Sequence, residues 1–202
     1  MAKTSKKSIA ILLICMLVAA LGLTGCGSND NGGDAEMVKI GIMQFGEFEA
    51  LQNANQGFQD GLAELGYKEG ENVTFNYLSA AADTANCPTI ADTLINDGSD
   101  LILAIATPSA SAIKEKTSDI PVLFTAVTDP AGSGLVADNA APGGNLTGTS
   151  DMNPVAQQIA LGKQLIPDAK KVAIMYCSSE SNSKIQSDLA EAAIKEAGME
   201  AV

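Results

Sequence analysis

The sequence contains no histidine, no arginine and no tryptophan among its 202 residues. Without histidine, it cannot build a serine–histidine nucleophile pair, a histidine zinc site or an imidazole general base. Without arginine, it cannot hold a carboxylate in a bidentate guanidinium fork. Any anionic ligand must therefore be bound by backbone N–H groups, hydroxyls or a lysine, and we find no catalytic constellation.

The charge of the chain is strongly negative. Twelve lysines stand against 24 carboxylates, for a formal net charge of −12 at pH 7. Residues 1–25 hold three of the lysines and no acidic residue, so their removal would leave nine lysines and a net charge of −15. An acidic surface repels nucleic acid and anionic lipid, so we expect no nucleic-acid partner.

The N-terminus has the layout of a bacterial secretory signal. Three lysines precede an apolar run from Ile9 to Leu23, which is shorter than the roughly 20 residues of a bilayer span. The run leads into Leu23-Thr24-Gly25-Cys26, a lipobox. We expect a signal peptide over 1–25, acyl chains such as palmitate on Cys26, a flexible tether over 26–36 and an extracytoplasmic protein anchored to the cell membrane. An uncleaved N-terminal anchor is the alternative, and it leaves the protein at the same surface.

Two of the four cysteines remain for the folded part of the chain. Cys15 lies in the apolar run and Cys26 is the lipidation site, which leaves Cys87 and Cys177. These two would pair in an oxidising compartment, or stay separate thiols. We favour separate thiols, because the two residues fall in segments assigned to different domains.

From residue 37 onward, β-rich runs alternate with amphipathic segments. The pattern predicts strands over 38–43, 72–77, 101–106, 121–127 and 172–176. Apolar spacings of three and four predict helices near 51–65, 87–95, 109–116, 154–166 and 185–197. Asn153 and Pro154 suit the cap and first position of the fourth helix. This alternation predicts a doubly wound α/β architecture with mainly parallel strands.

A glycine-rich stretch around 144–150 interrupts the alternation. We place a domain boundary there, between an N-terminal α/β lobe over 37–148 and the start of a C-terminal α/β lobe over 149–202. One strand and two helices cannot cover both faces of a sheet, so we expect the second lobe to be incomplete in this chain.

Polar residues gather directly after the predicted strands, where an open parallel sheet binds its ligand. They occur at 44–47, 107–109, 128–130, 149–151 and 178–183. Several precede helices, whose free N–H groups bind anions, and the carboxylates among them suit an ammonium group. The set favours a zwitterionic ligand, with Phe45 beside it as a core residue or a stacking face. In the alternative interpretation, each Ser, Thr, Asp or Asn only caps its own helix.

The same loops carry a family resemblance. The segments KIGIMQFGEFEAL, DLILAIATPSA, IPVLFTAVTDP, PGGNLTGTSD and MYCSSESNS together resemble substrate-binding lipoproteins of ABC importers, in the family that includes tryptophan- and tyrosine-binding proteins. The resemblance implies a type I periplasmic-binding-protein fold that closes on a small ligand between two lobes, with a permease and an ATPase as partners. It implies that the cleft is lined by Gln44, Thr107, Ser109, Thr128, Asp129, Ser150, Asp151, Glu180 and Asn182.

We therefore expect a binding protein and not an enzyme. It would capture a small ligand, an amino acid with an aromatic one favoured, for an ABC importer, with no metal and no cofactor. One alternative is a sensor that passes cleft occupancy to a membrane signalling receptor. Another, a surface-attached α/β hydrolase, needs a nucleophile and a base that the residues do not reveal.

Overall fold

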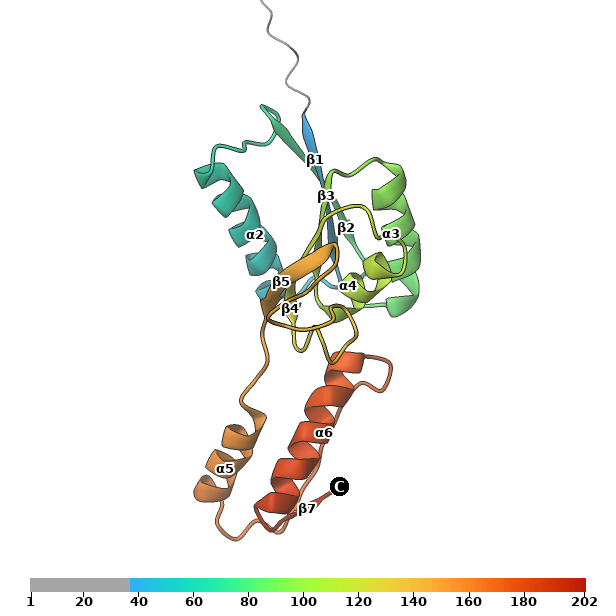
Figure 1. Cartoon of the computed structure of the whole chain (residues 1–202). Helices are drawn as coiled ribbons and strands as arrows, with labels where there is room; N and C mark the ends of the chain where they lie inside the picture. Colours follow the sequence, from blue (N-terminus) through green and yellow to red (C-terminus); the bar gives the residue numbers. More distant parts are fainter. Residues whose placement is uncertain (1–36) are drawn as a thin grey trace, which may run out of the picture. The chain divides into compact units, whose positions relative to one another are not determined.

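The computed structural model describes residues 37–202 (Figure 1). The predicted signal peptide, the tether and the lipidation site Cys26 lie outside the described residues. Within residues 37–202, no helix is both long and apolar enough to cross a membrane.

A five-stranded parallel sheet forms the centre of the first part of the described chain. Its strands are β1 (Val38–Gln44), β2 (Val73–Ser79), β3 (Leu101–Ile105), β4 (Val122–Val127) and β5 (Leu146–Ser150). Their order is β2-β1-β3-β4-β5, and every neighbouring pair is parallel. The predicted α/β class with a parallel sheet is confirmed.

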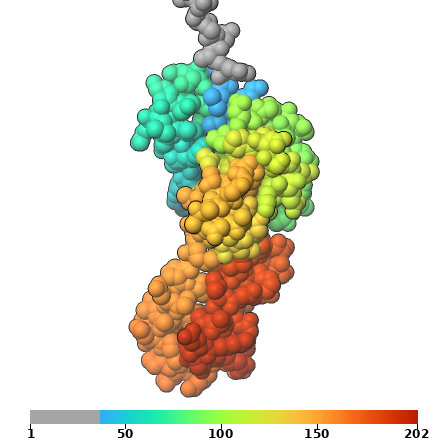
Figure 2. Space-filling view, in the orientation of Figure 1, coloured from blue at the N-terminus to red at the C-terminus, as the bar shows by residue number. Residues whose placement is uncertain are grey.

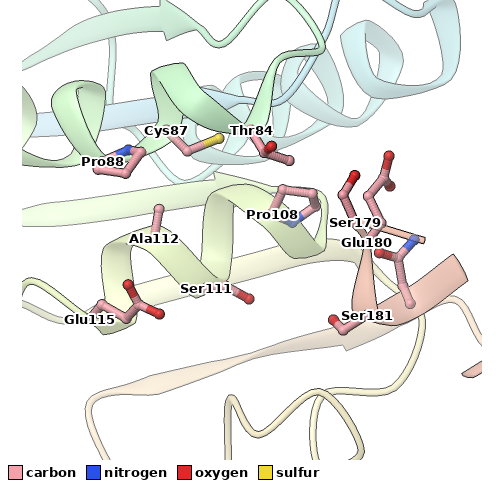
Figure 3. Close-up of a pocket in the computed structure, with 11 residues that line it drawn as sticks. Thr84, Cys87, Pro88, Pro108, Ser111, Ala112, Glu115, Ser179, Glu180 and Ser181 are labelled. Carbon is pink, nitrogen blue, oxygen red and sulfur yellow. The ribbon is translucent and has the colours of Figure 1, made fainter. Parts of the chain in front are cut away.

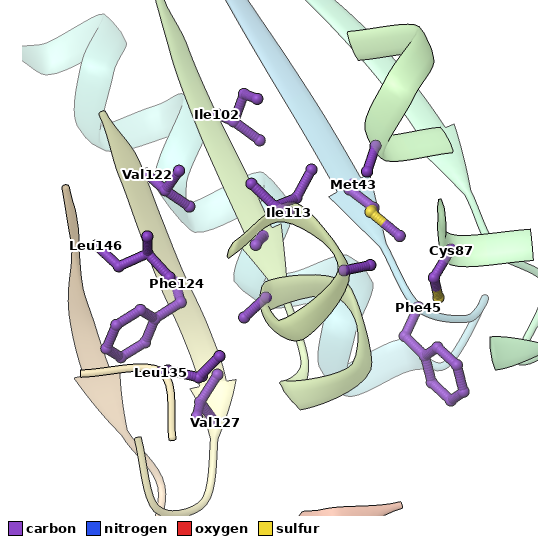
Figure 4. Packing of buried hydrophobic residues seen from close by; sticks show 14 of the residues in the cluster. Met43, Phe45, Cys87, Ile102, Ile113, Val122, Phe124, Val127, Leu135 and Leu146 are labelled. Carbon is purple, nitrogen blue, oxygen red and sulfur yellow. The ribbon is translucent and has the colours of Figure 1, made fainter. Parts of the chain in front are cut away.

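Helices cover both faces of this sheet (Figure 1). Helix α2 (Glu49–Glu64) packs on one face, while α3 (Cys87–Asn96), which follows the short 3-10 helix η1 (Thr84–Asn86), and α4 (Thr107–Lys114) pack on the other. Residues of β3 alternate between the two faces. Leu103 and Ile105 join the apolar cluster under α2, and Ile102 and Ala104 join the cluster under α3 and α4, part of which Figure 4 shows. The near-continuous apolar run of β3 is thus explained by burial on both faces.

Strand β5 is a difference from the prediction, which had no strand between 127 and 172. Gly148 pairs with Phe124 of β4, and a Cβ at Gly148 would lie 1.9 Å from the carbonyl oxygen of Phe124. The glycine therefore permits a close approach of two backbones. Four of the five β5 residues are exposed, so no apolar alternation marks this edge strand. The sheet reaches Ser150, two residues past the predicted boundary, and the division into two lobes stays a prediction.

The chain after β5 contains α5 (Val155–Leu165) and α6 (Ser181–Glu196), which pack against each other and are orange and red in Figure 2. A separate parallel pair is formed by β6 (Lys171–Val172) and β7 (Glu200–Ala201). Of the strand predicted over 172–176, the structure shows the two residues Lys171–Val172, which pair with Glu200 and Ala201. One more bond, from the Ile174 N–H to the Val202 carbonyl at 2.9 Å, follows the pair.

The start of α5 also differs from the prediction. The N-cap is Pro154, and no side-chain hydrogen bond caps the helix. The side-chain amide of Asn153 instead donates to Oε1 of Gln186 in α6 at 2.9 Å. The predicted Asn153 cap is wrong, because a tertiary contact takes the side chain that would have bonded the helix.

Candidate functional site

The carboxyl ends of β1 and β3 bring the first predicted site residues together. Gln44 pairs with Ile105, and the Phe45 N–H donates to the Ile105 carbonyl at 3.2 Å. Thr107 begins α4 two residues after Ile105. Gln44, Thr107 and Ser109 are only 0 %, 2 % and 0 % exposed. Three of the predicted ligand contacts thus lie buried at one edge of the sheet.

Each of these three side chains has a buried polar atom that makes no hydrogen bond. The atoms are Gln44 Oε1, Thr107 Oγ1 and Ser109 Oγ. Nε2 of Gln44 donates to the Gly46 carbonyl at 2.8 Å, which holds the amide in place and leaves its acceptor oxygen unused. Because buried polar atoms in proteins are nearly always paired, these three unpaired atoms at one edge of the sheet are candidates for contact with a bound molecule.

The backbone at the start of α4 adds further donors. Its N-cap Ala106 has φ 80° and ψ 155°, and no side chain caps the helix. This conformation is rare outside glycine and costs roughly 1–3 kcal/mol. The first turn of a helix leaves N–H groups without intrahelical partners. The strained turn therefore presents free N–H groups beside two hydroxyls, an arrangement that binds an anion without arginine.

Thr128 and Ser150, at the ends of β4 and β5, lie together. The Ser150 hydroxyl donates to the Thr128 carbonyl at 2.7 Å, and the amide of Gln186 donates to the Thr128 hydroxyl at 3.4 Å. Gln186 also accepts the bond from Asn153. Sequence reasoning missed Gln186, because a glutamine in the middle of a helix carries no local signal of a site.

The two predicted aspartates have different environments. Oδ1 of Asp129 accepts from the Gly132 N–H at 3.0 Å and from the Asn139 amide at 3.2 Å. These bonds, that of Gly132 first, lower the pKa of the Asp129 carboxyl. Asp129 therefore organises its own loop, as in the capping alternative. Asp151 is exposed, and its N–H donates to the Val127 carbonyl at 3.0 Å.

Glu180 and Asn182 line a pocket of about 250 Å³ beside α3 and α4, and Pro108, between Thr107 and Ser109, lines the same pocket (Figure 3). Oδ1 of Asn182 is buried there without a hydrogen-bond partner. The charged lining residues are Glu115 and Glu180, so the pocket favours a cationic group. The other lining residues are Thr84, Cys87, Pro88, Pro108, Ser111, Ala112, Ser179 and Ser181. Positions 108, 111, 112 and 115 of α4 are three and four residues apart or adjacent, so they share one face of the helix. This spacing could have predicted the pocket, but the prediction considered only the residues that follow strands.

Phe45 packs in the structure as a core residue. It is 7 % exposed and belongs to the apolar cluster that includes Met43 and Cys87 (Figure 4). Cys87 is buried and Cys177 exposed, and both are free thiols. Among residues 37–202, no three His, Cys, Asp or Glu side chains are grouped so that they could hold a metal ion.

Comparison with known proteins gives consistent matches. The model of the family described as ABC transporter substrate binding protein matches residues 39–202. A tyrosine-binding protein of Clostridioides difficile is 41% identical over 193 residues, which are 91% of this chain and 56% of that protein. The chain thus spans a little over half the length of this relative.

Solved structures agree with the fold. An ABC domain of Streptococcus pneumoniae in complex with L-Trp is 41% identical, with a TM-score of 0.78 over 83% of this chain and 56% of that one. A leucine-binding protein of Thermotoga maritima has a TM-score of 0.63 at 18% identity, over 82% of this chain and 48% of that one. The expected type I periplasmic-binding-protein fold is confirmed, with the chain covering part of it.

Proposed function

The chain belongs to the family of ABC transporter substrate-binding proteins, and from that premise we propose that it captures an amino acid, preferably an aromatic one, for an ABC importer. The proposal includes an interlobe cleft, an extracytoplasmic location, anchoring through a lipid on Cys26, and partnership with a permease and an ATPase. The lipobox supports the location, and the relatives that bind tyrosine or L-Trp support the ligand class.

The observation that carries the proposal is the set of unpaired atoms at Gln44, Thr107 and Ser109. The hydroxyls of Thr107 and Ser109 can donate to a carboxylate, together with the free N–H groups at the start of α4. Oε1 of Gln44 can only accept, so it suits the ammonium group. The head group of one α-amino acid has both a carboxylate and an ammonium group. These residues could therefore bind it without arginine or histidine.

The pocket beside α4 supports a ligand with a positively charged group. Its two charged side chains, Glu115 and Glu180, are both acidic, and no lysine lines it. Together with the donors at the start of α4, the candidate site therefore offers acceptors for an ammonium group and donors for a carboxylate. This pairing favours a zwitterion over a neutral sugar or a free anion.

Titration calorimetry of the full chain with L-tyrosine and L-tryptophan tests the proposal. We expect binding by the unaltered chain, and a loss of about tenfold or more in affinity for Ser109→Ala and Thr107→Val, since a hydrogen bond to a charged group contributes roughly 1.5–3 kcal/mol. The free energy of unfolding should not fall in either variant, because each removes a hydroxyl that has no partner in the folded protein.

Ser99→Ala is the matched control. The Ser99 hydroxyl is also buried, but it donates to the Leu94 carbonyl at 2.8 Å. Its removal should cost about 1 kcal/mol of stability and leave affinity unchanged. The proposal fails if the unaltered chain binds no amino acid, and the assignment of α4 fails if Ser109→Ala and Thr107→Val bind as tightly as the unaltered chain.

A further inference from the structure

The first two turns of α6 contact the loop that follows β4, residues 128–133. The side-chain amide of Gln186 donates to the Thr128 hydroxyl at 3.4 Å. One turn closer to the start of the helix, the Ser181 hydroxyl donates to the Ser133 hydroxyl, also at 3.4 Å. Two hydrogen bonds therefore hold the beginning of α6 to this loop.

Gly132 lets the helix come close to the same loop. A Cβ at Gly132 would lie 3.3 Å from Cδ1 of Ile185 in α6, and it would also collide with the Asp129 carboxylate. The Gly132 N–H donates to Oδ1 of Asp129 at 3.0 Å, which fixes the loop from within. The loop thus has a set shape and a gap in which Ile185 packs.

Gln186 uses both ends of its side-chain amide. Its Nε2 donates to Thr128, while its Oε1 accepts from the Asn153 side chain at 2.9 Å. Asn153 lies just after β5, and Ser150 at the end of β5 donates to the Thr128 carbonyl at 2.7 Å. These bonds form a closed circuit, so Gln186 fixes α6 to the ends of both β4 and β5.

The start of α6 also forms one wall of the pocket beside α4. Ser181 and Asn182, in the first turn of the helix, line this pocket, and residues of α3 and α4 line it as well (Figure 3). Asn182 lies four residues before Gln186, so the two share a face of α6. Gln186 itself is not among the residues that line this pocket. The placement of the wall therefore depends on a side chain outside the pocket.

We propose that Gln186 is a positioning residue for ligand binding, which holds the first turn of α6 at the pocket before a ligand arrives. The inference rests on the proposed function, since it assigns a residue that prepares the same candidate site. A wall that is already in place does not have to be ordered by the ligand, which makes binding tighter. When the wall is in place in only a fraction of the molecules, the apparent affinity falls by that fraction.

Two substitutions separate the hydrogen bonds of Gln186 from its packing. Gln186→Met keeps a side chain of similar length and removes both bonds, whereas Gln186→Glu still accepts from Asn153 and can accept from the Thr128 hydroxyl. We expect Gln186→Met to lower the affinity of the full chain for L-tryptophan roughly fivefold, the size of effect that one lost hydrogen bond produces. Gln186→Glu should restore most of that affinity.

Gln59→Ala is the matched control. Gln59 is half-buried like Gln186, and its amide donates to Oδ1 of Asn55 at 2.9 Å, but both residues belong to α2. Its removal should leave the affinity for L-tryptophan unchanged. The free energy of unfolding of every variant, measured alongside, shows that each one is folded under the conditions of the binding assay.

The rates of binding distinguish positioning from direct contact with the ligand. Because the chain contains no tryptophan, the fluorescence of L-tryptophan reports its binding without a tryptophan signal from the protein. Positioning predicts that Gln186→Met slows association and leaves dissociation unchanged, since the ligand enters and leaves the same fraction with the wall in place. Direct contact predicts faster dissociation instead.

Asn153→Ala breaks the same circuit at an exposed side chain, and so provides a second test. It should also slow association, and adding it to Gln186→Met should cause no further loss, because the two residues act together. If Gln186→Met binds as tightly as the unaltered chain, if its loss lies only in faster dissociation, or if the two losses add fully, this inference is wrong and the proposed function stands. If the unaltered chain binds neither L-tryptophan nor any other amino acid, the proposed function itself is wrong.

Discussion

The Tyr77 hydroxyl donates a 2.7 Å hydrogen bond to Oε1 of Glu47, and so joins the strand β2 to the loop that follows β1. The two residues are thirty positions apart in the sequence. Their contact fixes the orientation of a loop at the edge where the candidate ligand site lies. It also makes each group alter the titration of the other.

We predict that Tyr77 titrates well above the ordinary range of a tyrosine hydroxyl. Burial, followed by the hydrogen bond and the charge of Glu47, raises the pKa of Tyr77 from 10.0 to about 12. Since the folded pKa lies above the unfolded one, this contribution to stability is complete below pH 10 and is lost as the pH rises through about 12. Tyrosinate absorbance should show that Tyr77 ionises at high pH, and Glu47→Gln should shift the titration of Tyr77 to lower pH. The difference in absorbance between the unaltered chain and Tyr77→Phe isolates the titration of Tyr77, and a midpoint near pH 10 would contradict the prediction.

The hydrogen bond between Tyr77 and Glu47 also changes how stability depends on pH in the acid range. The hydrogen bond from Tyr77, with that from Gln52 next, lowers the pKa of Glu47 below its ordinary 4.5. Its contribution to stability is therefore present above pH 4.5 and is lost as the pH falls through the lowered value. Tyr77→Phe removes the main cause, so the stability of this variant should depend less on pH in that range.

We predict that Gly148→Ala destabilises the fold, whereas Gly57→Ala stabilises it. A Cβ at Gly148 would lie 1.9 Å from the Phe124 carbonyl oxygen and 2.6 Å from its ring, and such overpacking costs roughly 1–3 kcal/mol. Gly57 lies in α2, and apart from its chain neighbours and the helix's own backbone no atom lies within 4 Å of its Cβ position, so alanine there should gain roughly 0.5–1 kcal/mol. Denaturant unfolding of the two variants measures both effects, and equal stabilities would contradict the assignment of β5.

We predict that a thiol reagent labels Cys177 in the folded chain but labels Cys87 only after unfolding. Cys177 is exposed, while Cys87 is 2 % exposed, and burial, together with the charge of Asp83, raises the pKa of its thiol. The thiolate is the reactive form, so both effects protect Cys87. Mass spectrometry of the labelled peptides separates these cysteines from Cys15 and Cys26. If Cys87 is labelled as fast as Cys177, the packing around Cys87 is contradicted. If both cysteines react only after a reductant is added, they form a disulfide.

Much of the fold was predictable, because its elements have local causes. The apolar run of β3 is buried on both faces, and the apolar spacing in α2 places Leu51, Phe58 and Leu62 partly buried against the sheet. Strand β5 was not predictable in this way. Its residues are mostly exposed, so no apolar alternation exists, and what defines it is the close approach of Gly148 to Phe124.

The candidate site was predictable in its position and less so in its contacts. The polar residues after the strands do come to one edge of the sheet, as with Gln44 and Thr107. The sequence does not predict which hydroxyls stay without a hydrogen-bond partner, because Ser109 and Ser150 both belong to the polar segments predicted to line the cleft. In the structure, Ser150 has a partner in the Thr128 carbonyl and Ser109 has none.

The sequence by itself determined the α/β class, the lipobox, the lack of histidine and arginine chemistry, and the polar residues that follow the strands. These follow from composition, periodicity and short motifs, which need no knowledge of distant contacts. The tertiary structure alone decided that Gln44, Thr107 and Ser109 keep unpaired atoms, that Asn153 bonds Gln186 instead of capping α5, and that Glu47 accepts a bond from Tyr77. Each depends on which partners are brought within hydrogen-bonding distance, and that is a property of the packed chain.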